Sequence, residues 1–224
     1  MNTNLSANNA VMRPREKILQ VALDLFIKSG YDATSIDDIR RAADFKSKSG
    51  IYSHFRSKEE IAENLKTRIL NDIEQQVFAA YKEGLNNPKL QIIELMRAYI
   101  HWGLNHRSEF AFRIIRAQEE RMDKGQYDWQ KDLEEDKDLS LQTKNIYTLI
   151  VGVIQELKKQ NYPVRQIPEA ALFHMMIGAV SRAVIDRDSF GKCEQTEERT
   201  DWTAQTDQVL EACMGILFSE PINY

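Results

Sequence analysis

The stretch that decides the fold is residues 18–60, ILQVALDLFIKSGYDATSIDDIRRAADFKSKSGIYSHFRSKEE. Apolar residues in its first part recur at i, i+4, i+7 and i+8, a spacing that places them on one face of a helix. The pattern predicts a helix over residues 15–29 that ends at Gly30, because glycine adopts the backbone of a helix end without steric cost. The residues of this face are Ile18, Ala22, Leu25 and Phe26.

Two further short helices are predicted within the same stretch. The first begins at Thr34 or Ser35, because each has an aspartate three residues later, as in a capping box, and it breaks near Asp44. The second covers residues 47–55, and Ser57 then caps a longer fourth helix. Only a few residues separate the second helix from the third, which is typical of a helix-turn-helix motif.

The rest of the chain predicts longer helices, and hence an all-α protein of about nine helices, because glycine and proline are few and apolar residues recur at helical spacing. No apolar run approaches the 18 residues of a membrane span, and two cysteines make neither a disulfide framework nor a zinc site. We therefore expect a soluble cytoplasmic protein with no membrane partner. The expected elements are helices from Asn87-Pro88 to about His106, from Ser108, and over 139–160, 169–187 and 200–218. Residues 119–138 are expected to form an exposed loop or a polar helix end, and residues 188–199 a loop.

Charge is unevenly distributed along the chain. The net charge is −4, yet residues 1–60 hold 10 Lys and Arg against 8 Asp and Glu. Residues 39–58 contain six lysines and arginines and only one acidic residue, Asp44. Such a stripe is the electrostatic footprint expected of a protein that contacts phosphates, although a solvated helix face is the commoner explanation of a run of charge.

The segment Ile18 to Ile61 closely resembles the DNA-binding domain of the TetR family of transcriptional regulators. The resemblance covers a fifth of the chain and mixes core, cap and contact positions. One departure is that Ile39 and Tyr52 are one residue further apart than is usual in the family, with the extra residue within 46–50 and the usual turn glycine replaced by Asp44 or Phe45. The matching residues are Ile18-Leu19, Ala22, Leu25-Phe26, Gly30-Tyr31, Thr34-Ser35-Ile36, Ile39, Ala42-Ala43, Ile51-Tyr52-Ser53-His54-Phe55 and Ser57-Lys58-Glu59-Glu60.

The resemblance implies three parts: a disordered arm (1–13), a helix-turn-helix DNA-binding domain (14–60), and a helical ligand-binding and dimerisation domain (61–224). It also implies DNA contacts. Tyr52, Lys48 and Lys58 are expected at the phosphate backbone, with Thr34 mainly a cap and secondarily a phosphate contact. The candidates for base edges are Lys46, Ser47 and Ser49, and His54 is expected to contact phosphate or to pack.

One short helix reads only a few base pairs, so useful specificity requires a dimer that places two copies about one DNA turn apart. Two helices from each subunit, over 169–187 and at the chain end, would form a four-helix interface, which is the usual arrangement in the family. An ordinary intramolecular core explains the same apolar stripes. The predicted interface residues are Met176, Val180, Val184, Val209, Leu210, Cys213 and Leu217.

A regulator of this family also needs a cavity for a small-molecule effector between its middle helices. Aromatic residues at helical spacing are more often core than ligand contacts, and two arginines flanked by apolar residues would suit an anionic group if they point inward. The candidates are Trp102, Phe110, Phe112, Arg113, Arg116, Tyr147 and Phe173.

These observations favour a ligand-responsive, dimeric repressor that leaves a palindromic operator when its effector binds; activation stays open. An enzyme on a helical scaffold is the second reading, but no nucleotide-binding glycine motif or zinc motif is present, and no histidine has a glutamate three residues before it. We therefore expect no catalytic residue, metal or cofactor. A third reading is a helical adaptor that binds protein, which would have no need for the basic stripe around residues 40–58.

Overall fold

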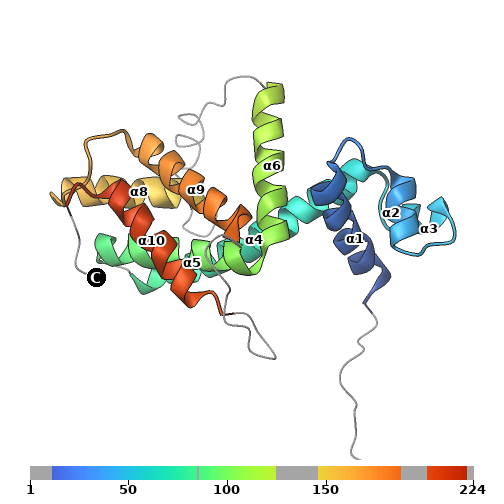
Figure 1. Ribbon diagram of the computed structural model, residues 1–224, viewed down its shortest axis with the longest axis horizontal. Helices are drawn as coiled ribbons and strands as arrows, with labels where there is room; N and C mark the ends of the chain where they lie inside the picture. Colours follow the sequence, from blue (N-terminus) through green and yellow to red (C-terminus); the bar gives the residue numbers. More distant parts are fainter. Residues whose placement is uncertain (1–11, 85, 125–145, 188–200, 221–224) are drawn as a thin grey trace, which may run out of the picture. The chain divides into compact units, whose positions relative to one another are not determined.

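The computed structural model describes residues 12–84, 86–124, 146–187 and 201–220, and these ranges contain nine α-helices and no strand beyond one isolated bridge, between Val164 and Phe218 (Figure 1). The prediction of an all-α protein is confirmed. None of the described helices is long and apolar enough to cross a bilayer. The helices are α1 (Pro14–Ser29), α2 (Ile36–Ala42), α3 (Lys48–Tyr52), α4 (Lys58–Glu83), α5 (Pro88–Asn105), α6 (Arg107–Lys124), α8 (Ile146–Lys159), α9 (Glu169–Ile185) and α10 (Thr203–Leu217).

The chain divides into two compact units, Met1–Thr67 and Arg68–Tyr224. The division falls inside α4, seven residues after the boundary that the sequence suggested at residue 60. The N-terminal unit holds α1 to α3 and the first turns of α4, and its core is made by the apolar residues that face inward from all four helices. Its fully buried members include Ile18, Ala22, Ile39, Ile51, Phe55 and Ile61.

Local signals at the helix ends act as the sequence predicts. Gly30 ends α1 with a φ of +87°, a backbone conformation that strains residues with a side chain. Ser35 is the N-cap of α2, and its hydroxyl and the Asp38 carboxylate bond each other's backbone N–H groups in a complete capping box. At the start of α4 the Ser57 hydroxyl accepts from the N–H of Glu60, 3.2 Å away.

Helix α3 is shorter than predicted. It spans five residues, Lys48–Tyr52, where the sequence suggested residues 47–55. The backbone leaves the α-helical pattern after Tyr52, because the N–H groups of His54 and Phe55 both bond the carbonyl of Ile51. Phe55 is buried after this turn, and only Arg56 separates it from Ser57, the cap of α4. Helix α3 therefore ends before it could reach Phe55.

The C-terminal unit is built around α5, which packs against α8 and α10, while α9 packs against α6, α8 and α10. Figure 1 shows α10 running beside both α5 and α9. Gly103 on α5 permits a close approach: a Cβ there would lie 2.8 Å from Phe110 of α6 and 2.9 Å from Val184 of α9. A larger residue at this position would force the three helices apart.

Several predicted boundaries differ from those observed. Helix α6 continues to Lys124, so residues 119–124 form a polar helix end, one of the two alternatives predicted for 119–138. Asn87 caps α5 through its side chain, which accepts from the N–H of Leu90, and Pro88 is its first residue, as predicted. The predicted arm 1–13, the loops over 125–138 and 188–199, and the helix start at 139–145 lie wholly or mainly outside the described residues.

Candidate nucleic-acid interface

The turn between α2 and α3 is built around Asp44. This residue has a φ of +61°, and it occupies one of the two positions at which the family resemblance implies a glycine. The N–H of Asp44 bonds the carbonyl of Arg41 (3.2 Å), and the N–H of Phe45 bonds that of Arg40 (3.0 Å), which together form a Schellman helix end. Aspartate tolerates this left-handed conformation better than most residues, so the motif survives the substitution. Of the two positions that the sequence left open for the turn, the left-handed residue is Asp44.

Phe45, the residue that follows this turn, packs against α3 and the residues after it. Its ring lies over Gly50 of α3, where an added Cβ would approach the ring to 2.6 Å. The same ring meets the edge of the His54 imidazole, with centroids 6.3 Å apart. His54 is therefore half-buried in a packing contact, which fits one of the two roles predicted for it.

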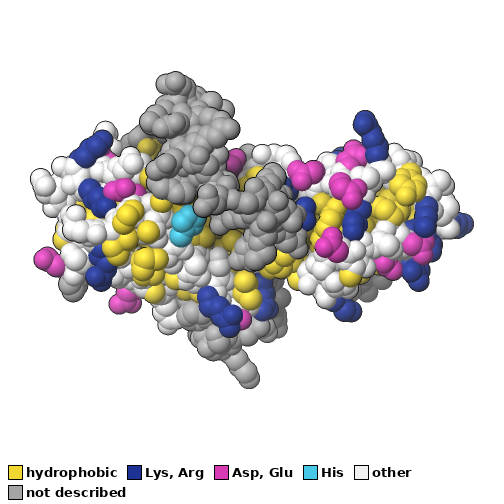
Figure 2. All heavy atoms as spheres, turned by 90° about the horizontal axis from the view of Figure 1, so that it is seen from above, with side chains coloured by type: hydrophobic (Ala, Val, Ile, Leu, Met, Phe, Trp, Pro, Cys, Tyr) yellow, Lys and Arg dark blue, Asp and Glu magenta, His cyan; other side chains and the backbone are white. Residues whose placement is uncertain are grey.

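The positive charge of the basic stripe is partly neutralised by ion pairs within the chain. Arg40 and Arg41 both form ion pairs with Asp37, at 2.8 and 3.1 Å, and Arg41 also pairs with Asp38. Hydrogen bonds, chiefly from Arg40 to Asp37 and from Ser35 to Asp38, lower the pKa of both carboxyl groups. On the face seen in Figure 2, the cations of the N-terminal unit are likewise interspersed with acidic side chains.

The cations and hydroxyls that remain available lie around the start of α3. Lys46 and Lys48 are exposed and make no hydrogen bond or ion pair with another described residue. The hydroxyls of Ser47 and Ser49 are 2.6 Å apart and both residues are exposed. Tyr52 is 51% exposed although Ile51 beside it is fully buried. The structure therefore brings five of the predicted contact residues onto one exposed element, with donors, acceptors and positive charge.

Two predicted phosphate contacts are used within the chain instead. Thr34 is 3% exposed, and its hydroxyl bonds the carbonyl of Gly30 at 2.8 Å, so it neither caps α2 nor reaches solvent. The Lys58 ammonium donates to the carbonyls of Tyr31 (2.8 Å) and Asp32 (3.4 Å) and lies 4.2 Å from the centre of the Tyr31 ring. Both residues bond the loop between α1 and α2, Thr34 through a carbonyl four residues away and Lys58 through carbonyls 26 and 27 residues away.

Residues 18–65 match the family described as "Bacterial regulatory proteins, tetR family". The HTH-type transcriptional regulator QacR of Staphylococcus aureus is 45% identical over 60 residues, 27% of this chain and 29% of QacR. Residues 18–65 thus have the sequence of a TetR-type DNA-binding domain. The negative transcriptional regulator IcaR of Staphylococcus epidermidis is 43% identical over 47 residues, 21% of this chain and 25% of IcaR. The alignments thus span less than a third of these curated TetR-type relatives, and they lie in the DNA-binding domain.

Beyond that domain the similarity is one of fold. The structure of the ketosteroid transcriptional regulator KstR2 of Mycobacterium tuberculosis aligns with 94% of this chain and 97% of KstR2, with a TM-score of 0.63 and 19% identity. The C-terminal unit therefore has the TetR helical architecture, and any ligand has to be inferred from the residues of this unit.

The residues predicted for an effector cavity form two separate groups in the described contacts. Trp102 and Phe110 are buried in the core beside Tyr99, with ring centroids 6.4 Å apart, and Phe112 is buried as well. Tyr147 and Phe173 meet edge to face at 4.8 Å between α8 and α9. Arg113 and Arg116 are half-buried on α6. Most of these aromatic side chains are thus part of the hydrophobic core of the C-terminal unit.

The seven residues predicted for a dimer interface are buried within the single chain, although Val209 also lines a groove between α9 and α10. Each is 4% exposed or less, because α9 and α10 pack their apolar faces on each other and on α5. The list is Met176, Val180, Val184, Val209, Leu210, Cys213 and Leu217.

The opposite faces of α9 and α10 carry small residues that the predicted interface did not include. Gly178 and Gly215 have nothing within 4 Å of an added Cβ, and Met175 of α9 is 49% exposed. A groove of about 430 Å³ lies along these faces. It is lined by Ala179, Arg182, Ala183, Asp186, Gln208, Val209 and Ala212. Small residues within otherwise apolar helices were the signal that could have identified this face.

Proposed function

We propose that this protein is a dimeric, effector-responsive repressor that binds a palindromic DNA operator through α3. The observation that carries the proposal is the composition of α3: its inner side is buried through Ile51, while its start and outer side present Lys46, Lys48, two serine hydroxyls and Tyr52. Those groups suit phosphate and base-edge contacts in a major groove.

The size of α3 argues for a dimer. Five residues make a helix of about 8 Å, which is shorter than the roughly 12 Å width of the major groove, so one copy can read only a few base pairs. Two copies related by a twofold axis would read two half-sites about one DNA turn apart. Operator symmetry would then follow from protein symmetry.

The surface that we assign to dimer formation is the outer face of α9 and α10. Its alanines and glycines allow two helices to approach closely, and Arg182, which pairs with the C-cap residue Asp186, also lines the groove. A second copy that places the same face against it would bury Met175 and complete a four-helix contact.

Repression is favoured over activation because IcaR, a relative in the DNA-binding domain, is named as a negative regulator. An effector that binds the C-terminal unit better in one spacing of the two α3 helices would shift the dimer toward that spacing. The affinity for DNA would then change by at most the ratio of the effector's affinities for the two spacings.

Selection from a randomised duplex pool tests the proposal. The full chain should enrich a palindrome, and a variant with Lys46 and Lys48 both changed to Met should enrich no sequence. Lys159→Met, which removes an exposed charge from α8, is the matched control and should enrich the same palindrome as the unchanged chain. Failure of the unchanged chain to enrich any sequence would favour the adaptor reading instead.

A further inference from the structure

Two half-buried charged side chains of the C-terminal unit lie near each other without forming an ion pair. Arg113 on α6 lowers the pKa of Glu74 on α4, whereas burial raises that pKa by more, so that its net shift is upward. In the described part of the chain, no salt bridge of 4 Å or less joins the two residues. Their charges are therefore only partly balanced by each other.

The nearest partner of Arg113 is neutral. Its Nη1 donates a hydrogen bond to the Tyr99 hydroxyl, 3.1 Å away, and no carboxylate of the described residues lies within ion-pair distance. Arginine cannot escape a low-dielectric environment by losing its proton, whereas a glutamic acid can take one up. The guanidinium of Arg113 therefore keeps its charge without an ion pair to any described carboxylate, which favours an anion as a partner.

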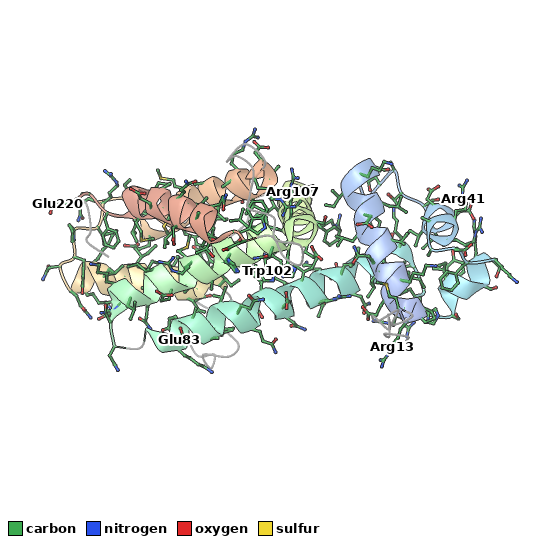
Figure 3. The ribbon with its side chains drawn as sticks, turned by 60° about the horizontal axis from the view of Figure 1, so that its bottom comes forward. Arg13, Arg41, Glu83, Trp102, Arg107 and Glu220 are labelled. Atoms are coloured by element: carbon green, nitrogen blue, oxygen red, sulfur yellow. The ribbon has the colours of Figure 1, made fainter. Side chains whose placement is uncertain are left out.

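The same cluster has hydrogen-bonding capacity left. The Tyr99 hydroxyl accepts from Arg113 and keeps its own proton to donate, so a ligand acceptor could meet the guanidinium and the phenol together. The Tyr99 ring lies beside Phe110, with centroids 5.6 Å apart. Trp102 is fixed next to them, since its Nε1 donates to the Asp72 carboxylate at 2.6 Å; Figure 3 shows Trp102 on α5 beside α4. The polar pair of Arg113 and Tyr99 therefore lies against the aromatic core of the C-terminal unit.

We propose that Arg113 and Tyr99 anchor the carboxylate of an effector that also carries an apolar, aromatic or alkyl portion. This inference rests on the proposed function, since it names the chemical class of the effector. A cationic effector is disfavoured because it would meet the permanent charge of Arg113, and Glu74 can become neutral when an anion enters.

Isothermal titration calorimetry of the full chain without DNA tests this proposal. The probes are phenylacetate, 4-phenylbutyrate and 6-phenylhexanoate, each compared with its primary amide. At least one acid should bind with a Kd below about 1 mM, and its amide should bind at least about tenfold more weakly, because the charge-assisted bond to Arg113 is lost. If no acid binds, or if acid and amide bind equally, the proposal is wrong.

Variants separate anchoring from structural effects. Arg113→Met should weaken binding of the acid by about 10- to 100-fold, and the matched variant Lys159→Met should leave it unchanged. Tyr99→Phe keeps the ring and should weaken binding several-fold. Glu74→Gln should tighten binding, because a like charge is removed, which a purely structural role would not produce. Unaltered acid binding in both Arg113→Met and Tyr99→Phe would overturn the assignment.

The two proposals can fail independently. Because no DNA is present, an absence of acid binding in a chain that still enriches a palindrome would refute only the effector class. Acid binding by a chain that enriches no duplex would refute only the proposed DNA function.

Discussion

Lys48 and Lys58 have different roles in the structure, and replacing each by Met separates them. Lys58 donates to two loop carbonyls and lies over the Tyr31 ring, whereas Lys48 is exposed and makes no hydrogen bond or ion pair with a described residue. We expect Lys58→Met to destabilise the N-terminal unit and Lys48→Met to weaken DNA binding. The sequence alone placed both lysines at the phosphate backbone.

The structure sets the expected magnitudes. Loss of the carbonyl and ring contacts of Lys58 should lower the free energy of unfolding by about 1 to 2 kcal/mol, a range typical of part-buried charged hydrogen bonds and cation–π contacts. Lys48→Met should change it by less than about 0.5 kcal/mol, as most surface substitutions do. On duplex DNA, loss of one phosphate contact reduces the slope of log K against log salt by about 0.9 per subunit, or about 1.8 for a dimer.

Urea unfolding and fluorescence anisotropy on a non-specific duplex, from about 50 to 200 mM salt, measure the two effects. Lys58→Met should show reduced stability with an unchanged salt slope. Lys48→Met should show unchanged stability with a reduced salt slope. A Lys58→Met protein of full stability with a flattened salt slope would refute the positioning role and restore the phosphate contact.

Three further predictions concern the turn, the dimer surface and the titrating groups. Asp44→Gly should raise the free energy of unfolding by about 0.5 to 1 kcal/mol, because glycine fits the φ of +61°; a loss of stability in urea would contradict the Schellman assignment. Ala212→Arg in the outer groove should give monomers by sedimentation, whereas Gln155→Arg on α8 should not; intact dimers in the first variant would exclude this face. The pKa of Cys213 is raised to about 12 by burial, so the native thiol should resist a disulfide reagent at pH 8 in a Cys193→Ser background; rapid labelling without unfolding would show that it is not enclosed.

The pH dependence of the capping box follows from the lowered pKa of Asp38. A carboxyl group with a depressed pKa in the folded state stabilises the fold above its unfolded pKa and loses that effect as pH falls through the folded value. The ordinary value is 3.8, so the stability advantage over Asp38→Asn should be constant from pH 7 to about pH 5 and should vanish well below pH 4. An advantage that persists in strong acid would contradict the role of the ionised carboxylate.

The fold could be predicted from the sequence because its signals are local. The end of α1 at Gly30, the capping box at Ser35 and the start of α5 at Asn87-Pro88 each depend on residues within one helical turn. The length of α3 could not be predicted in this way, because it depends on how Phe55 is buried against other helices.

The candidate site was predicted less completely, for a physical reason. An apolar stripe shows that a helix face is buried, but it does not show whether the same chain or a second copy covers it, and Val180 and Leu210 proved to be covered by their own chain. Likewise, a lysine count does not reveal which ammonium is already bonded. Lys58 bonds carbonyls 26 and 27 residues away, a contact that no local pattern encodes.

The most direct test of twofold DNA reading is affinity as a function of half-site spacing on the selected palindrome. A dimer that places two α3 helices on one face of the duplex should lose about 100-fold or more in affinity when five base pairs, half a helical turn, are inserted at the centre, since both half-sites can no longer be engaged. Equal affinity for the original and the expanded duplex would contradict the account.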